Sequence, residues 1–84
     1  MSGSWSVYLL LCGDGTLYCG IALDPEIRLE AHRCGKGARY TKGRGPLALI
    51  HVESCQDKSS ALRREREIKG MSRARKLALA NGPS

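Results

Sequence analysis

The chain has 84 residues and a mass of 9.1 kDa, which is below the ~100–200 residues typical of a domain, so a two-domain enzyme is excluded. Hydrophobic residues make up 42% of the sequence and charged residues 26%, a balance typical of soluble globular proteins. No apolar run approaches the ~18 residues of a membrane span. With no Phe, one Trp and three Tyr, the core must be mainly aliphatic, and the few aromatic residues become informative.

The net charge of +6 is concentrated in two blocks of the sequence. Residues 33–44 contain five basic residues and no acidic one, and residues 58–84 contain eight basic residues against two acidic ones. Clustering of this kind favours a polyanionic partner such as nucleic acid. The alternative is a basic surface that is merely solvated.

The four cysteines lie at positions 12, 19, 34 and 55, without a Cys-x-x-Cys spacing or a pair of histidines. This pattern excludes a structural zinc site of the zinc-finger type. The first residues lack the charged and apolar regions of a signal peptide. We therefore expect reduced thiols in a cytoplasmic protein that does not associate with membranes, with Cys12 and Cys19 as small strand residues.

Two apolar segments, residues 5–12 and 17–23, flank a short polar stretch that contains Asp14-Gly15. This pattern predicts a β-hairpin with Asp-Gly as its turn.

A turn centred on that dipeptide also predicts the register of the hairpin. Leu11 should lie opposite Tyr18, and Tyr8 opposite Ile21. The two tyrosines then lie on neighbouring strands, although a slip of one residue would move either of them to the other face of the sheet.

A helix is predicted over residues 25–34. Asp24 is a capping residue, Pro25 suits the first helical position, and Gly35 is a suitable stop.

Two kinds of side chain follow helical spacing on this segment. Ile27, Ala31 and Cys34 form one stripe, and Arg28 and His32 lie four residues apart on an adjoining face. The planar fork of Arg28 suits a phosphate, and the alternative is a solvated arginine. His32 could donate to a phosphate or leaving group, or merely cap the helix end.

Residues 35–46 form a basic, glycine-rich loop, followed by a predicted third strand over residues 47–52. The loop lacks the spacing of a phosphate-binding P-loop. Tyr40 could stack on nucleic acid or could anchor the loop through its apolar ring. The residues that we expect to contact nucleic acid are Lys36, Arg39, Tyr40, Lys42 and Arg44.

Two helices complete the pattern. The first is capped by Ser59 or Ser60 and runs to about Lys69, and the second is capped by Ser72 and runs to about Ala80.

The element order ββαβαα predicts an α/β protein of the α+β type, with a three-stranded, largely antiparallel sheet flanked by helices. We expect one domain over residues 1–84, with a core of about residues 5–80.

Glu65 is the clearest anomaly in the sequence. Ala61, Glu65 and Ile68 share helical spacing, with Leu62 beside them, so Glu65 should lie on or at the rim of a buried stripe. An inward carboxylate is costly unless a cation or a metal meets it. The alternative is an intrahelical pair with Lys69, worth only ~0.3–0.5 kcal/mol. The positions expected to face solvent are Arg63, Arg64, Arg66 and Lys69.

Together these residues resemble the GIY-YIG nuclease superfamily over nearly the whole chain. The likeness is greatest to its small single-domain bacterial members, which are similar to the nuclease half of structure-specific, branch-cutting endonucleases. The first motif corresponds to residues 6–8, of which only Tyr8 is retained, and the second to residues 18–20, Tyr-Cys-Gly. Arg28 followed four residues later by His32 matches the helix signature. Ala61-Leu-Arg-Arg-Glu65 matches the Ala-Leu-x-x-Glu motif.

The resemblance implies a GIY-YIG fold and a divalent-metal-dependent endonuclease that hydrolyses phosphodiester bonds in DNA, in repair or recombination. It implies that Glu65 holds one Mg²⁺ or Mn²⁺ ion, with water and phosphate as further ligands. Tyr8 or Tyr18 would take a proton from the attacking water, and Arg28 would neutralise charge on the phosphate, with His32 in the same site. No nucleotide cofactor is implied.

Two other functions fit the sequence. The first is a nucleic-acid-binding module that keeps the fold with weak or no cleavage. The second is a small scaffold that binds a protein partner, which the charge and the retained motif residues disfavour.

Overall fold

The computed structural model describes residues 5–34 and 45–81. Its elements are, in chain order, β1 (Trp5–Leu11), β2 (Leu17–Ala22), α1 (Pro25–Arg33), β3 (Ala48–Cys55), α2 (Lys58–Lys69) and α3 (Arg73–Asn81). The strands form one sheet in the order β2-β1-β3, and both pairings with β1 are antiparallel. The predicted element order and antiparallel sheet are confirmed. Some of the predictions concern residues outside the described ranges. These are the helix stop at Gly35 and the nucleic-acid contacts of Lys36, Arg39, Tyr40, Lys42 and Arg44.

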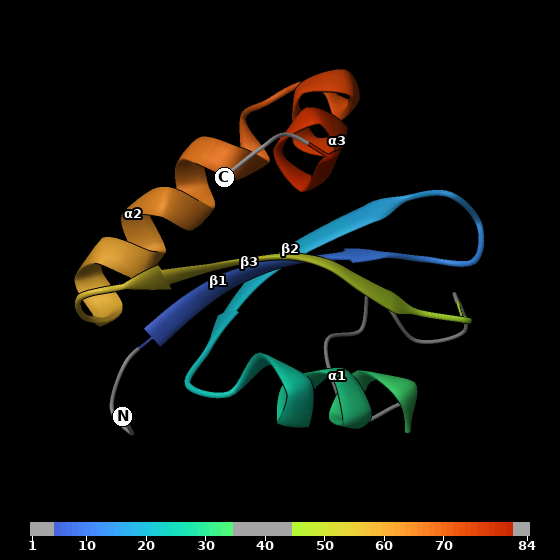
Figure 1. The fold of residues 1–84 in the computed structure, drawn as a ribbon, viewed down its shortest axis with the longest axis horizontal. Helices are drawn as coiled ribbons and strands as arrows, with labels where there is room; N and C mark the ends of the chain where they lie inside the picture. Colours follow the sequence, from blue (N-terminus) through green and yellow to red (C-terminus); the bar gives the residue numbers. More distant parts are fainter. Residues whose placement is uncertain (1–4, 35–44, 82–84) are drawn as a thin grey trace.

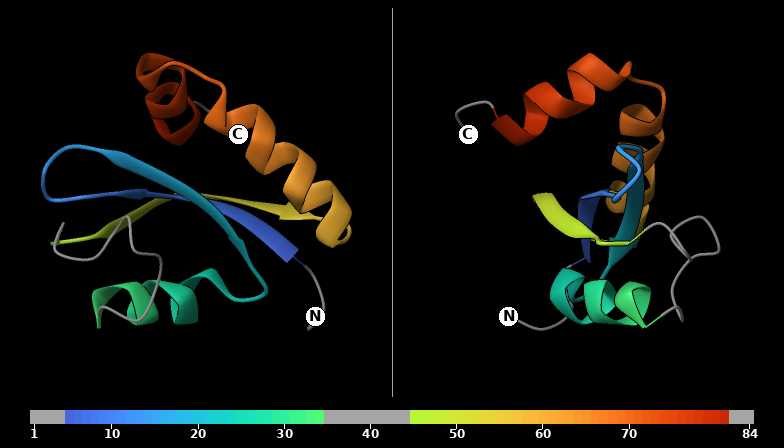
Figure 2. Two further views of the ribbon diagram at one scale, coloured as in Figure 1. Left: turned by 180° about the vertical axis from the view of Figure 1, so that it is seen from behind. Right: turned by 90° about the vertical axis from the view of Figure 1, so that its right-hand side faces the viewer.

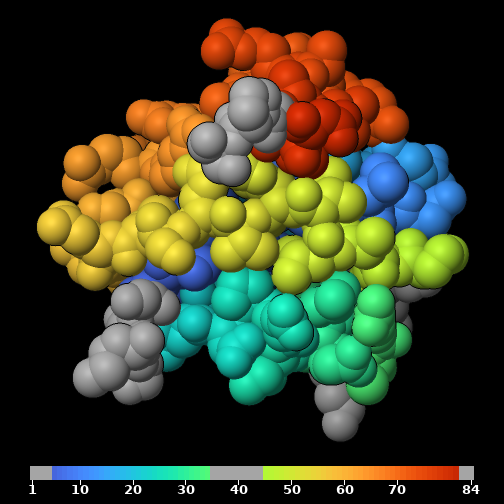
Figure 3. All heavy atoms as spheres, in the orientation of Figure 1, coloured from blue at the N-terminus to red at the C-terminus, as the bar shows by residue number. Residues whose placement is uncertain are grey.

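The sheet separates two helical layers. The α2 and α3 helices cover one face and α1 covers the other, as Figure 1 and the end-on view in Figure 2 show. The space-filling view in Figure 3 shows β3 as a band between α1 on one side and α2 and α3 on the other. Side chains on the two faces of the sheet therefore meet different helices.

Among the described helices, none is both long enough and apolar enough to span a membrane.

The turn between β1 and β2 differs from the expected one. The backbone N–H of Cys12 donates to the carbonyl of Thr16 at 2.9 Å, and the N–H of Gly15 donates to the carbonyl of Cys12 at 2.9 Å. Gly15 has a φ of 87°, a left-handed conformation that glycine adopts without steric cost. Three residues, 13–15, therefore form the turn, in the arrangement of a turn followed by a glycine bulge.

This longer turn shifts the hairpin register by one residue. Tyr18 lies opposite Leu10, and Tyr8 lies opposite Gly20, so the predicted pairings of Tyr18 with Leu11 and of Tyr8 with Ile21 are wrong. Because side chains alternate along a strand, the shift places both tyrosines on the same face of the sheet, whereas the predicted register separates them. That face is the one covered by α1.

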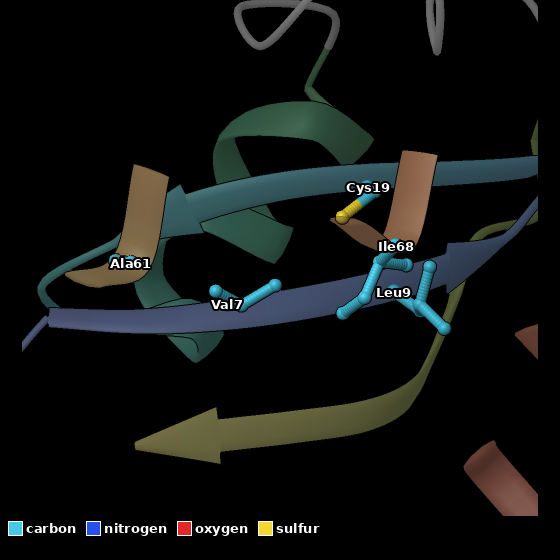
Figure 4. Packing of buried hydrophobic residues seen from close by; sticks show 5 residues of the cluster. All are labelled: Val7, Leu9, Cys19, Ala61 and Ile68. Atoms are coloured by element: carbon cyan, nitrogen blue, oxygen red, sulfur yellow. The ribbon is translucent and has the colours of Figure 1, made fainter. Parts of the chain in front are cut away.

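The other face of the sheet forms the aliphatic core with α2. Figure 4 shows side chains from β1, β2 and α2 meeting there. The buried residues of this core are each at most 4% exposed. They are Val7, Leu9, Cys19, Ala61 and Ile68. The buried stripe on α2 is thus confirmed at Ala61 and Ile68, whereas Leu62 is 42% exposed.

Arg64 was expected to face solvent and instead joins α2 to β3. Its Nε and Nη2 atoms donate to the two carboxylate oxygens of Glu53 at 2.8 and 3.1 Å, and its Nη1 donates to Glu67 at 3.0 Å. The Nε2 atom of His51 lies 2.8 Å from Glu53. The hydrogen bonds from Arg64 lower the pKa of Glu53. A partner on a distant strand, which helical spacing cannot reveal, explains the difference.

The helix starts follow capping chemistry. Asp24 accepts hydrogen bonds from the N–H groups of Glu26 and Ile27 at 3.0 and 3.2 Å, with Pro25 at the first position, as predicted for α1. Ser72 likewise caps α3, since its hydroxyl oxygen accepts from the N–H of Arg75 at 3.3 Å.

The predicted cap of α2 is wrong. Asp57 caps this helix by accepting from the N–H of Ser60 at 2.8 Å, and Ser59 and Ser60 lie inside the first turn. An ionised carboxylate at a helix N-terminus also interacts favourably with the helix dipole, which a serine hydroxyl does not.

Candidate active site

The face of α1 that contacts the sheet is not the predicted apolar stripe. Ile27 is 70% exposed and Cys34 is also exposed, whereas Leu29 packs against the sheet and His32 is 2% exposed. A buried histidine needs a hydrogen-bond partner. That partner comes from the sheet.

The Tyr8 hydroxyl lies 3.0 Å from the Nε2 atom of His32. Burial raises the pKa of Tyr8 to about 12, and burial together with the nearby charge of Arg28 lowers the pKa of His32. The phenol is therefore protonated and the imidazole neutral at pH 7. The two neutral groups therefore share one hydrogen bond, whose donor is set by the tautomer of His32.

Arg28 provides the positive charge beside this pair. It is exposed on α1, one turn before His32. Its charge lowers the pKa of both Tyr8 and Tyr18. The structure thus brings the two predicted helix residues and both tyrosines together.

Tyr18 lies on the edge strand β2, between groups from opposite layers. Its ring packs edge-to-face on His32, with centroids 5.2 Å apart, and lies 6.3 Å from the Tyr8 ring. Burial raises the pKa of Tyr18, Lys69 and Arg28 lower it, and Glu65 raises it. Tyr18 is therefore within electrostatic range of Arg28 on α1 and of Glu65 and Lys69 on α2.

Glu65 lies at the rim of the core, as predicted, with its side chain 18% exposed. The intrahelical pair considered as an alternative is present, since the Nζ atom of Lys69 lies 3.4 Å from a Glu65 oxygen. Within residues 5–34 and 45–81 no group of three His, Cys, Asp or Glu side chains is arranged to hold a metal. Glu65 is thus a lone carboxylate beside Tyr18, a donor set that fits a hard divalent cation completed by water and phosphate.

The structure explains why the second motif ends in glycine at position 20. The sequence alone did not indicate a role for this residue. A Cβ atom at this position would lie 2.6 Å from the Tyr8 hydroxyl, 2.8 Å from the Tyr8 Cζ atom and 3.1 Å from a Tyr18 ring carbon. The Tyr8 ring therefore crosses directly over Gly20, its partner in the β1–β2 pairing. The missing side chain makes room for both rings.

Cys19, between the two motif residues on β2, points to the opposite face. Its thiol is buried, and that burial raises its pKa to about 11, with a further rise from Glu65. It is therefore a neutral core residue and not a nucleophile.

Comparisons with known proteins show the family of this chain. The family model described as the GIY-YIG catalytic domain matches residues 4–78, and the chain belongs to this family. It is similar to the UPF0213 protein of Natronomonas pharaonis, with 47% identity over 94% of this chain and 93% of the relative. A UPF0213 protein of Pseudomonas aeruginosa is 49% identical over 93% of this chain and 75% of its own. The resemblance inferred from the motifs is thus confirmed.

A solved structure shares the fold. The solution NMR structure of a UPF0213 protein from Bacillus halodurans matches with a TM-score of 0.59 and 41% identity, over 95% of this chain and 88% of that chain.

We predict that Gly20→Ala destabilises the protein by ~1–3 kcal/mol, because the new methyl group must displace a ring that His32 holds in place. Gly70→Ala is the matched control, since a Cβ atom there would make only ordinary contacts of 3.6 and 3.7 Å with carbonyl oxygens. Urea unfolding measures both variants. An equal free energy of unfolding for Gly20→Ala and Gly70→Ala would show that the Tyr8 ring does not lie over Gly20.

A second prediction concerns acid pH. Because the pKa of His32 is lowered in the folded state, the folded protein binds fewer protons than the unfolded chain as the pH falls below the ordinary value of 6.5. The free energy of unfolding should therefore decrease from about pH 7.5 to about pH 5.5. His32→Gln, which keeps a hydrogen-bond acceptor for Tyr8, should show a smaller decrease. An NMR titration that places His32 at or above its ordinary pKa would contradict this.

Proposed function

We propose that the protein is a divalent-metal-dependent endonuclease that hydrolyses phosphodiester bonds in DNA. The observation that carries the proposal is the convergence of Tyr18, Arg28 and Glu65, from three different elements, at the β2 edge of a GIY-YIG fold. A single domain over residues 1–84, a cytoplasmic location and a role in repair or recombination stay predictions of the sequence.

Glu65 is the residue that would hold the metal. Its pair with Lys69 does not oppose this role, because the lysine side chain is 55% exposed and such pairs contribute only ~0.3–0.5 kcal/mol. A divalent cation such as Mg²⁺ or Mn²⁺ can displace so weak a partner. Once bound, such an ion would neutralise Glu65 and polarise the phosphate.

Tyr18 is the better placed of the two tyrosines to take a proton from the attacking water. Tyr8 is 1% exposed and is hydrogen-bonded to His32, whereas Tyr18 is only partly buried. The ordinary pKa of tyrosine, near 10, places the tyrosinate ~4 kcal/mol above the neutral phenol at pH 7, and burial raises the pKa of Tyr18 further. Arg28 and Lys69 lower this cost, and neutralisation of Glu65 would lower it further.

Arg28 has the second chemical role. Its guanidinium is exposed and lies beside both tyrosines, so it can pair with a phosphate oxygen and stabilise the negative charge that develops there. Tyr8 and His32 are positioning residues in this scheme. Their hydrogen bond holds the His32 ring edge-to-face against the Tyr18 ring, and so fixes the position of Tyr18.

The basic loop supplies the remaining contacts in this proposal. Its phosphate-binding side chains would fix the DNA relative to the site without reading sequence. The residues that we propose for these contacts are Lys36, Arg39, Tyr40, Lys42 and Arg44.

We predict that Glu65→Gln reduces Mg²⁺-dependent DNA cleavage by at least ~100-fold, while DNA affinity in EDTA stays within about threefold, because only the metal ligand is lost. Glu67→Gln is the matched control. It removes the same charge from the same helix, at an exposed position whose partner is Arg64. Gel assays on linear, single-stranded, flap and four-way DNA, with proteins purified in parallel, measure the rates.

Cleavage by Glu65→Gln at the wild-type rate would show that Glu65 does not hold the metal. If the wild-type protein binds DNA but cuts none of the four substrates in Mg²⁺ or Mn²⁺, the chain is instead a nucleic-acid-binding module.

A further inference from the structure

The proposed chemistry leaves the second basic block, on α2 and α3, without a role. Part of this block borders an open pocket of ≈ 240 Å³ at the hairpin end of β2, between that strand and α3. The residues that line the pocket are Thr16, Leu17, Arg73 and Lys76. No aromatic ring and no carboxylate is among them. With two cations in its lining, the pocket is suited to an anion.

Both cations of this pocket are held close to the hairpin. The Nη1 atom of Arg73 donates a hydrogen bond to the carbonyl oxygen of Gly15. Lys76 is only partly exposed, and its charge lowers the pKa of the buried Cys19 on β2. Lys76 forms no ion pair with any residue that the structure describes, unlike Arg64 or Lys69. Because Lys76 has no counter-ion among the described residues, its ammonium group is available to an anion that enters the pocket.

The pocket continues the candidate active site along one strand. Thr16 and Leu17 directly precede Tyr18, at ~3.3 Å per residue. Cys19, which follows Tyr18, lies within range of both places, because the charges of Lys69 and of the pocket residue Lys76 act on it. Arg28, Lys69 and Lys76 thus all act on residues of β2, an edge strand of the described sheet, and of these three cations Lys69 is paired with Glu65.

We infer that this pocket binds a phosphate of the DNA backbone close to the phosphate that is cut. The inference rests on the proposed function, since it names a second contact for the same substrate. A row of cations along a strand edge matches a polymer that carries regularly spaced phosphates better than it matches a single free anion. Contacts of this kind orient the substrate without reading its sequence.

Lys76→Gln tests the inference, with Arg75→Gln as the matched control. Each variant removes one positive charge from the first turn of α3, but Arg75 is exposed and does not line the pocket. Fluorescence anisotropy with labelled single-stranded and duplex DNA, in EDTA at several salt concentrations, gives affinity and its salt dependence. Lys76→Gln should weaken duplex binding roughly five- to tenfold at 0.1 M salt and reduce the slope against log salt by about 0.9. Arg75→Gln should stay within about twofold.

Lys76→Arg separates loss of contact from loss of fold, because it keeps the charge and should bind DNA like the wild type. Equal affinity and slope for Lys76→Gln and Arg75→Gln would overturn the inference. If the wild-type protein still cuts DNA in that case, the proposed function stands without the pocket. A wild-type protein that neither binds nor cuts DNA would overturn both.

Discussion

The left-handed backbone at Gly15 determines which side chains can form the site. Because this residue extends the turn to three residues, Tyr8 and Tyr18 lie on the same face of the sheet and beneath α1. A two-residue turn would place one of them in the aliphatic core against α2. The turn thus determines which side chains meet at the candidate active site, and its Gly15 carbonyl also accepts a hydrogen bond from Arg73.

Burial and charge then act against each other at the β2 edge. The low polarity that raises the pKa of both tyrosines keeps them neutral, and the cations of α1 and α2 reduce that effect. Gly20 permits the close packing on which this balance depends, since any side chain there would separate Tyr8 from its place beside His32. The same arrangement explains how a protein of this size can bring groups from three elements to one edge of its sheet.

Much of this architecture could be predicted from local sequence signals. Capping residues located α1 and α3, and apolar runs located the strands, because both signals act within a few residues. The hairpin register could not be predicted, since Asp-Gly fits turns of two or three residues. The burial of His32 and the pairing of Arg64 with Glu53 also escaped prediction, because each depends on a partner from a distant element. Motif spacing predicted Tyr8, Tyr18, Arg28, His32 and Glu65 as site residues, whereas the contacts that join Tyr8 and Tyr18 to His32 depend on the fold.

The rates of DNA cleavage for Tyr8→Phe, Tyr18→Phe and the double variant test whether Tyr18 is the base and Tyr8 its support, as we propose from their shared face. Single-turnover rates at saturating DNA should fall by at least ~100-fold for Tyr18→Phe and by less for Tyr8→Phe. The double variant should be no slower than Tyr18→Phe alone, because Tyr8 acts through Tyr18. These roles are wrong if the losses of the two single variants multiply in the double variant, or if Tyr18→Phe cuts DNA at the wild-type rate.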